Sequence, residues 1–476
     1  MVDTSIPGPD HPPYQLPLSD EGFAHALEDG LGRAWLHAVA HPTASVQALM
    51  LDAMLTCQSY DAQCEGDRGG WMLGMADAAA VTERLLPDFL AQATQAPTGD
   101  YPRRDLNQRC TILAELVKRD VEEARPVLYR IFHEYDGDPV GYQDIIDVDG
   151  AEGLIAVCEE LGQRAIAGVK TYIEEWILTS FDKAHADGAA RAALQPKRAS
   201  LRGVAEFLDR IDADERVRQE RKIQRKRRKK RGEPAPFDPT TPSNPARYHH
   251  LSADEAIEWI EKAPTQDGML DAPYWIRDWA RHADEDALEL ILSKLEAESR
   301  PLQIKRFLNV FVNRTIEHPP EHAIELLRHQ DEGVRRIAYA AFKRVRDARI
   351  RSLAKQALAR PEIAAGALDL WIKNFEPGDA HPIEQAFAIE PDRDDRHWTL
   401  MSLVGVVEAN PIAECARLMR LAYEHTPCTM CRNRAVEAMD SAKALPNWIA
   451  QECKFDASDD LRERFDGPSC GTEYKD

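Results

Sequence analysis

Several features of membrane and secreted proteins are missing from this sequence of 476 residues. No stretch approaches about 20 consecutive apolar residues, and no early apolar run has the length and flanks of a signal peptide. Nine cysteines at irregular spacing argue against a disulfide scaffold and fit reduced intracellular thiols. We therefore expect a soluble protein without a transmembrane segment, located in the cytoplasm.

Signals for strands and for common catalytic sites are also missing. No segment shows sustained alternation of β-branched and polar residues, so we expect essentially no sheet. The sequence contains no G-x-x-x-x-G-K-[ST] phosphate loop, no G-x-S-x-G nucleophile motif and no H-E-x-x-H metal motif. No catalytic residue is predicted, and a role without catalysis is favoured.

What the sequence does contain is helical periodicity along nearly its whole length. In the segment 22–40, Phe23, Leu27, Leu31 and Trp35 recur four residues apart, which predicts one helix with one apolar face. Similar segments alternate with short breaks that contain Gly, Pro or Asp, a rhythm typical of stacked helical hairpins. The acidic stretch 135–153 differs, and we expect it to form a long solvated loop.

Residues 331–360 give the clearest paired pattern. One apolar face comprises Val334, Ile337, Ala338 and Ala341, and after a turn around Asp347 a second comprises Ile350, Leu353, Ala354, Ala357 and Leu358. This pair resembles a HEAT-type repeat, in which small residues let two helices approach and Asp and Arg near the turns link neighbouring repeats. The resemblance extends over roughly 250–466 and more weakly over 20–210. It implies an all-α fold, an α-solenoid of HEAT-like (armadillo-like) helical hairpins in two blocks.

Some proteins with HEAT-like repeats are enzymes, and their motifs can be compared with this sequence. Deoxyhypusine hydroxylases carry several His-Glu dipeptides, whereas this chain offers His133-Glu134 alone at that motif. HEAT-like DNA glycosylases use a cleft with aromatic side chains, and Trp275, Arg277 and Trp279 suit such a surface. Core packing with an arginine at the rim explains the same three residues. We expect the large aromatics, Trp176 and Trp398 among them, to pack between repeats.

Charge and proline content divide the chain. Residues 1–213 and 233–476 carry net charges of −17 and −12, whereas residues 214–232 carry +8. Five prolines follow within residues 234–245, which is typical of an extended linker. After them, Ser252 and Glu255 predict the capping box of a new helix. We predict a flexible N-terminal tail over 1–18, a helical-repeat block over 19–213, a basic segment with a Pro-rich linker over 214–250, and a C-terminal HEAT-like block over 251–476.

The basic segment concentrates eleven Lys and Arg within residues 216–231. Such a run attracts nucleic acid, an anionic membrane surface or an acidic protein. No aromatic residue interrupts it, so base-specific recognition is not supported. A solvated linker that folds back onto the acidic blocks explains the same charges. The candidate binding residues are Arg221, Lys222, Arg225, Lys226, Arg227, Arg228, Lys229, Lys230 and Arg231.

A second candidate site lies near the C-terminus, where His425, Cys428 and Cys431 form an H-x2-C-x2-C pattern. Thiolates and imidazole are ligands that zinc prefers, with Cys453 or Cys470 as the fourth. The metal site is therefore predicted as His425, Cys428, Cys431 and Cys453. Two alternatives stay open: a redox pair at a helix N-terminus, and small residues packed at a repeat junction. Zinc is the one cofactor that the sequence suggests.

These features predict a non-enzymatic scaffold or protein-interaction module that binds a partner through an acidic solenoid surface. Because that surface is acidic, a basic protein or peptide is the expected partner. One alternative is a nucleic-acid-associated protein anchored non-specifically by the basic segment 216–231. Another is a HEAT-like DNA-modifying enzyme.

Overall fold

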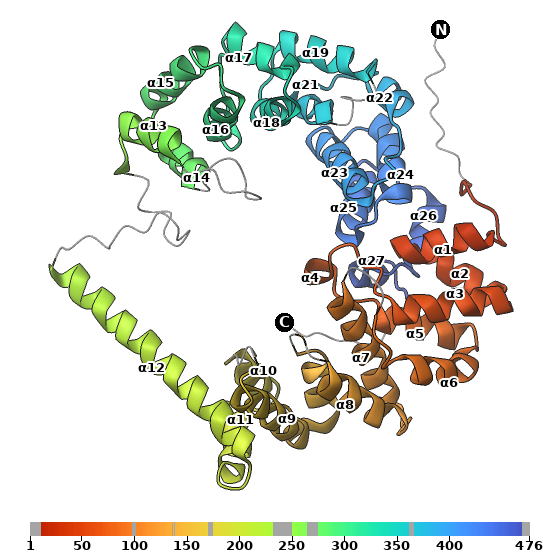
Figure 1. The fold of residues 1–476 in the computed structure, drawn as a ribbon. Helices are drawn as coiled ribbons and strands as arrows, with labels where there is room; N and C mark the ends of the chain where they lie inside the picture. The colour runs from red at the N-terminus through yellow and green to blue at the C-terminus, as the bar shows by residue number, and fades with distance from the viewer. Residues whose placement is uncertain are drawn as a thin grey trace. The chain divides into compact units, whose positions relative to one another are not determined.

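The computed structural model describes most of the chain. Outside the description lie residues 1–10, 98–100, 136, 138, 170–174, 232–249, 264–274, 361–365 and 469–476, and the side chains of residues 225 and 228–231. Every regular element in the described ranges is a helix, which confirms the predicted all-α class (Figure 1). Among these helices, none has the length and apolar content that a membrane span requires.

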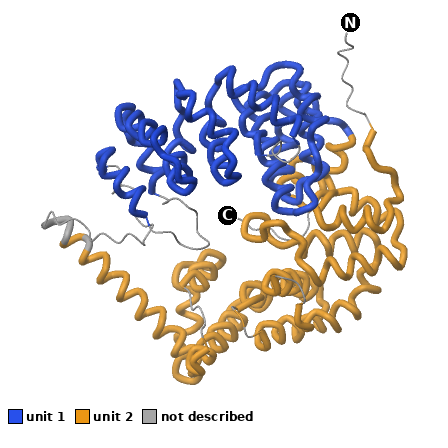
Figure 2. The backbone as a smooth tube through the Cα atoms, turned by 45° about the horizontal axis from the view of Figure 1, so that its top comes forward, with its two compact units in different colours: residues 1–10, 237–447 blue, residues 11–236, 448–476 orange. Residues whose placement is uncertain are grey.

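The chain forms two compact units, which Figure 2 shows in different colours. Unit 1 comprises residues 1–10 and 237–447, and unit 2 comprises residues 11–236 and 448–476. The passage from unit 2 to unit 1 near residue 236 falls inside the predicted linker. The prediction, however, placed 448–476 in the C-terminal block, whereas the structure groups this segment with the N-terminal helices.

Unit 2 is built mainly from the first half of the chain. Its elements are α1 (Asp20–Asp29), α2 (Gly32–Ala40), α3 (Ala44–Leu55), α4 (Ala62–Glu65), α5 (Gly69–Ala78), α6 (Thr82–Gln92), α7 (Pro102–Lys118), α8 (Ala124–Glu134), α9 (Tyr142–Ile166), α10 (Trp176–Ala184), α11 (Ala189–Leu194), η1 (Gln195–Lys197), α12 (Arg202–Arg231), α26 (Asn447–Cys453) and α27 (Asp459–Arg464).

Unit 1 continues with shorter helices. They are α13 (Ala253–Lys262), α14 (Trp275–His282), α15 (Glu285–Glu296), α16 (Pro301–Phe311), α17 (Glu321–Glu325), η3 (Leu326–Arg328), α18 (Glu332–Phe342), α19 (Ala348–Leu358), η4 (Leu368–Leu370), α21 (Trp371–Asn374), α22 (Ala380–Ala386), α23 (Arg393–Ala409), η5 (Ala413–Cys415), α24 (Ala416–His425) and α25 (Thr429–Ser441).

The segment 22–40 forms two helices, so the prediction of one continuous helix is wrong. Gly30 ends α1 in a left-handed conformation, with φ of 73°, and Leu31 then caps α2. Glycine adopts this conformation without the penalty that a Cβ atom brings, which favours a stop at this position. Phe23, Leu27, Leu31 and Trp35 are nevertheless all buried, because both helices turn their apolar sides to the same core.

The acidic stretch 135–153 is largely helical, so the prediction of a long loop there is also wrong. Helix α9 begins at Tyr142 and continues to Ile166, with a kink at Gly150. Ile145 and Ile146 are buried in its first half, and Leu154 is buried after the kink. These apolar residues form the buried face of the helix. The loop was predicted from the many acidic residues in this stretch, and that composition does not reveal the spacing of the few apolar ones.

The C-terminal segment 448–467 packs against the first helices of unit 2. The Glu452 carboxylate pairs with the Arg33 guanidinium at 2.7 Å, and both side chains are buried. It also accepts a hydrogen bond from the Tyr14 hydroxyl at 3.0 Å, although Tyr14 lies in the predicted tail 1–18. The Trp71 indole donates to the Phe455 carbonyl at 2.9 Å. Contacts between residues far apart in the sequence therefore close unit 2.

In unit 1, helices contact their neighbours in chain order. Helix α15 contacts α13, α16 and α17, while α16 contacts α14 and α18, so alternate helices lie in two rows (Figure 1). The predicted capping box begins the first row, because the Ser252 amide donates to Glu255 at 2.8 Å and the Glu255 amide donates back to Ser252. Local order of this kind needs few contacts between distant residues.

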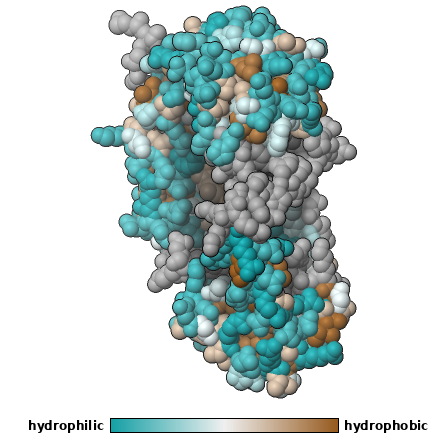
Figure 3. All heavy atoms as spheres, turned by 90° about the vertical axis from the view of Figure 1, so that its left-hand side faces the viewer, coloured by the Kyte–Doolittle hydropathy of each residue, from teal (hydrophilic) through white to brown (hydrophobic). Residues whose placement is uncertain are grey.

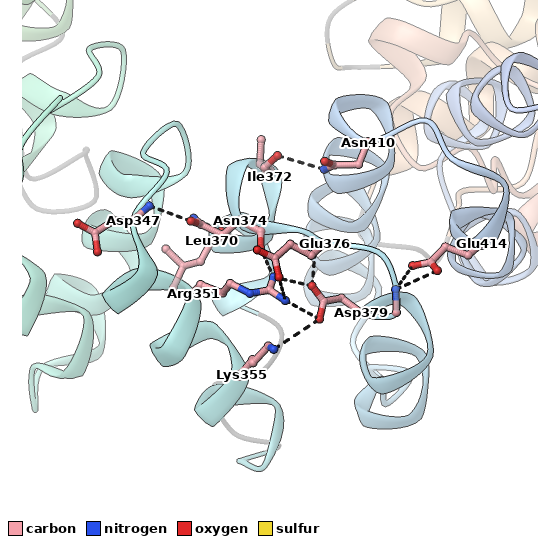
Figure 4. A network of polar contacts seen from close by, with 11 residues as sticks. Asp347, Arg351, Lys355, Leu370, Ile372, Asn374, Glu376, Asp379, Asn410 and Glu414 are labelled. Carbon is pink, nitrogen blue, oxygen red and sulfur yellow. Dashed lines mark hydrogen bonds and ion pairs between the residues drawn. The ribbon is translucent and has the colours of Figure 1, made fainter. Parts of the chain in front are cut away.

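Side-chain hydrogen bonds to backbone carbonyls join several neighbouring helix pairs of unit 1, and Figure 4 shows one of them, from Asn410 to Ile372. The donors and the accepting carbonyls are Arg314 and Ala283 (3.3 Å), Arg349 and Pro319 (2.9 Å), Asn374 and Val345 (2.9 Å), and Asn410 and Ile372 (3.1 Å). The two members of each pair lie 31, 30, 29 and 38 residues apart. We refer to this set of side-chain-to-carbonyl bonds as the carbonyl ladder; the bonds of Arg349 and Asn374 join the same two helix pairs.

Candidate functional site

Three metal-ligating side chains converge inside unit 1. His397 lies on α23, Cys428 is the residue that caps α25, and Cys431 lies in the first turn of α25. Their ligand atoms all lie within 4.8 Å of one another, and the His397 Nδ1 atom is 4.0 Å from the Cys431 sulfur. The three residues are 8%, 5% and 4% exposed. We call this group the Cys-His cluster.

The surroundings of the Cys-His cluster fix its sulfur atoms. The Cys428 amide donates to the Thr426 hydroxyl at 3.3 Å, which holds the turn before α25. The Arg434 guanidinium hydrogen-bonds to Cys431 and is held by Glu408 through two bonds of 2.8 Å. A cation beside a sulfur favours the thiolate form, which is the form that binds metals.

The pKa of the Cys428 thiol is strongly raised by its surroundings. Its hydrogen bond to Cys431 raises its pKa, burial raises the pKa further, and the hydrogen bond to His397 lowers it by less. Cys428 is therefore a neutral thiol near pH 7. A neutral, buried thiol is a poor nucleophile, so this cysteine does not suit rapid thiol exchange with a substrate.

The observed cluster contains two of the four residues that the sequence predicted for metal. His425 ends α24 and lies outside the group, and Cys453 lies on α26 in unit 2. Cys470 lies outside the described residues. His397 was missed because it precedes Cys431 by 34 residues, and only the packing of α23 on α25 brings it close. No spacing rule of a local motif reaches that far.

The basic segment forms the outer half of α12. The inner half is anchored to α9, where Gly162 and Gly203 cross so closely that a Cβ atom on Gly162 would lie 1.9 Å from the Gly203 carbonyl oxygen. Phe207 and Ile211 are buried beside this crossing. Beyond it, Val217 and Ile223 are 44% and 50% exposed, so the helix continues without a buried face.

The cations of this outer half face solvent where they are described. Arg221, Lys222, Lys226 and Arg227 are exposed and form no ion pair within the described part of the chain. The predicted residues Arg225, Arg228, Lys229, Lys230 and Arg231 belong to the same helix, but their side chains lie outside the description. These four cations are therefore not paired with any acid among the described residues, whereas Arg218 of the same helix pairs with Glu175.

A groove runs between the start of α10 and the middle of α12. It is lined by Glu175, Trp176, Thr179, Asp214, Val217, Arg218 and Arg221. Trp176 is 40% exposed and stands edge-on to Tyr142, with ring centroids 5.2 Å apart. Arg218 pairs with Glu175 at 2.6 Å. The expectation that Trp176 packs between repeats is wrong, since an exposed aromatic ring here adjoins the basic helix, and the same expectation is wrong for exposed Trp398.

Of the three residues compared with a glycosylase surface, Trp279 lies in the core, whereas Trp275 and Arg277 are half-buried. Trp279 is buried, and its indole donates to the Leu251 carbonyl at 3.1 Å. Trp275 stands edge-on to Trp259, with ring centroids 5.8 Å apart, and Arg277 donates to the Asn309 side chain at 2.7 Å. These contacts match the interpretation as core packing with an arginine at the rim.

Comparison of the chain with known protein families, curated proteins and solved structures finds no match in any of the three.

Proposed function

We propose that this protein is a non-enzymatic scaffold, an α-solenoid of HEAT-like hairpins that binds a basic protein or peptide through an acidic surface. The carbonyl ladder is the observation that carries the proposal. In three of its bonds a polar side chain reaches a backbone carbonyl of the preceding helix pair, about 30 residues earlier in the chain, and contacts of this kind between neighbouring pairs are what stacked repeats would make. Stacked repeats expose one long row of helices, which suits the docking of an extended partner.

The first helices of unit 1 supply the acidic surface. The exposed carboxylates of α13, α15 and α17 that form neither an ion pair nor a side-chain hydrogen bond with described residues are Asp254, Glu261, Asp286, Glu289 and Glu325. We call them the acidic row, because α15 contacts both α13 and α17. Figure 3 shows a face on which hydrophilic residues predominate and hydrophobic residues lie in small groups. Such a surface favours charge-guided docking over apolar docking.

The proposal is tested with a short fluorescent peptide rich in Lys and Arg, whose binding to the full chain is followed by anisotropy. Replacement of the acidic row by Asn and Gln (D254N, E261Q, D286N, E289Q and E325Q together) is expected to weaken binding at least about tenfold. The loss should be largest at low ionic strength, because the row is exposed.

A matched control changes the same number of charges elsewhere. Glu21, Glu83, Asp88, Glu134 and Asp187 are exposed carboxylates of unit 2 and are replaced by Gln or Asn together. Binding should change by less than about twofold in this variant. Equal losses in both variants would mean that net charge alone attracts the peptide, and the proposed surface would be withdrawn.

A second candidate function is non-specific nucleic-acid association through α12. It is favoured by the described cations that no carboxylate neutralises, and by Trp176 in the adjoining groove, which can stack on a base. A labelled single-stranded oligonucleotide should bind with strong salt dependence. Replacement of Arg221, Lys222, Lys226 and Arg227 by Gln should weaken that binding and reduce its salt dependence, whereas the same change at the exposed Arg84, Arg130, Lys183 and Lys294 should have little effect.

A further inference from the structure

The Cys-His cluster has the dimensions of an ion-binding site. A tetrahedral zinc ion, with Zn–S of about 2.3 Å and Zn–N of about 2.0 Å, holds its donor atoms about 3.5–3.8 Å apart. The His397 Nδ1 atom already lies 4.0 Å from the Cys431 sulfur, and all three donor atoms lie within 4.8 Å of one another. Shifts of a few tenths of an ångström to about one ångström bring the donors to coordination distances.

We propose that His397, Cys428 and Cys431 bind one soft divalent metal ion, zinc by its ligand preference. The donors come from two helices, so the ion cross-links α23 to the start of α25. No further His, Cys, Asp or Glu of the described residues joins the group, which leaves the fourth coordination position to water or another small ligand. This inference does not depend on the scaffold proposal.

Packing alone explains two buried sulfurs, because a free cysteine packs as a small apolar residue, but it does not explain why both lie next to a buried imidazole. A buried imidazole nitrogen and two buried sulfurs face one another across two helices, although apolar side chains would fill the same space without desolvation of polar atoms. Arg434 reaches Cys431 while Glu408 holds it in place, as the outer contacts of a metal site commonly do. Zinc binding would replace each S–H bond by a Zn–S bond and release the protons to solvent.

The ion is tested on the full chain. Protein purified without chelators should contain one zinc per chain by elemental analysis. After chelator treatment it should bind Co²⁺ with the absorption of tetrahedral thiolate coordination, and Zn²⁺ should displace the cobalt. Zinc should also raise the midpoint of thermal unfolding and protect two cysteines from a thiol reagent.

Single variants locate the site. H397A, C428S and C431S should each weaken Zn²⁺ binding by at least about 10- to 100-fold. C415S, H425Q and C453S are controls: Cys415 is a buried cysteine of unit 1 outside the group, and the other two residues were predicted from sequence alone. Circular dichroism checks that every variant folds, and the cobalt spectrum of the unsubstituted chain tests the site even if a variant does not.

Three results would overturn the proposal. The unsubstituted chain could bind neither zinc nor cobalt, or H397A could bind zinc as tightly as the parent. Alternatively, metal-free protein could contain a Cys428–Cys431 disulfide, seen as the loss of two hydrogens in its mass, which would favour a redox pair.

Discussion

The two units hold themselves together over very different distances along the chain. In unit 1 the carbonyl ladder joins residues that are 29 to 38 positions apart, and each helix pair needs only its neighbours. In unit 2 the ion pair between Arg33 and Glu452 joins residues that are 419 positions apart. Unit 1 should therefore tolerate local damage, whereas the stability of unit 2 depends on one distant segment.

The largest effect is expected at the buried ion pair of unit 2. Glu452→Ala removes the carboxylate that pairs with the buried Arg33 guanidinium and should cost about 3–5 kcal/mol. Amide hydrogen exchange should accelerate in α1 and α2 while α15 to α19 of unit 1 remain protected. Glu285→Ala is the control, because Glu285 is 77% exposed and its pair with Arg314 should contribute less than about 1 kcal/mol. Equal acceleration in both units would contradict the comparison.

The next prediction concerns the pH dependence of the unfolding free energy of unit 2. Burial raises the pKa of Asp144 in unit 2 from 3.8 to about 7, with Asp67 and Asp147 adding to the shift and Lys118 opposing it. Between about pH 4 and pH 7 the unfolded carboxyl is ionised while the folded one holds its proton. The unfolding free energy of unit 2 should therefore fall as pH rises, by at most about 1.4 kcal/mol per pH unit.

Asp144→Asn should flatten that slope and stabilise unit 2 at neutral pH, as measured by urea unfolding at pH 5 and pH 7. Glu152→Gln is the control, because Glu152 is exposed on the same helix and is not among the groups that shift the pKa of Asp144. An unchanged slope in the Asp144 variant would show that another group titrates in this range.

The smallest of the three effects is expected in the carbonyl ladder. Asn374→Ala leaves the Val345 carbonyl and the Asp347 amide without their side-chain partner and should cost about 1–3 kcal/mol. The loss should remain local to α18, α19 and α21 in hydrogen exchange. Gln356→Ala removes an exposed side chain bonded to Arg328 and should have no measurable effect. Loss of protection throughout unit 1 would show that its helix pairs do not unfold separately.

Sequence reasoning succeeded where the signal was local. The capping box at Ser252 needs only Glu255, three residues away, and the exposed outer half of α12 follows from the scarcity of apolar residues beyond Val217. The two faces of residues 331–360 form α18 and α19, with Asp347 as the cap between them. Each of these features lies within a few turns of helix, where periodicity and capping rules apply.

Prediction from the sequence failed where a contact joins elements that are far apart in the chain. His397 lies in the Cys-His cluster because α23 packs on α25. Glu452 pairs with Arg33 because the C-terminal segment packs against the first helices of unit 2. Periodicity indicates which face of a helix is buried but not which element covers it. For the same reason it did not foresee that Trp176 lies beside the basic helix.

The return of residues 448–467 has a consequence for how the protein is made. Arg33 is translated long before Glu452. Its guanidinium therefore has no counter-charge from Glu452 while residues 237–447 of unit 1 are being translated. Unit 1, whose contacts are between neighbours, can fold during that interval. The two units then finish folding in the reverse of the order in which most of their residues are translated. Unit 2, which contains most of the first half of the chain, is completed last.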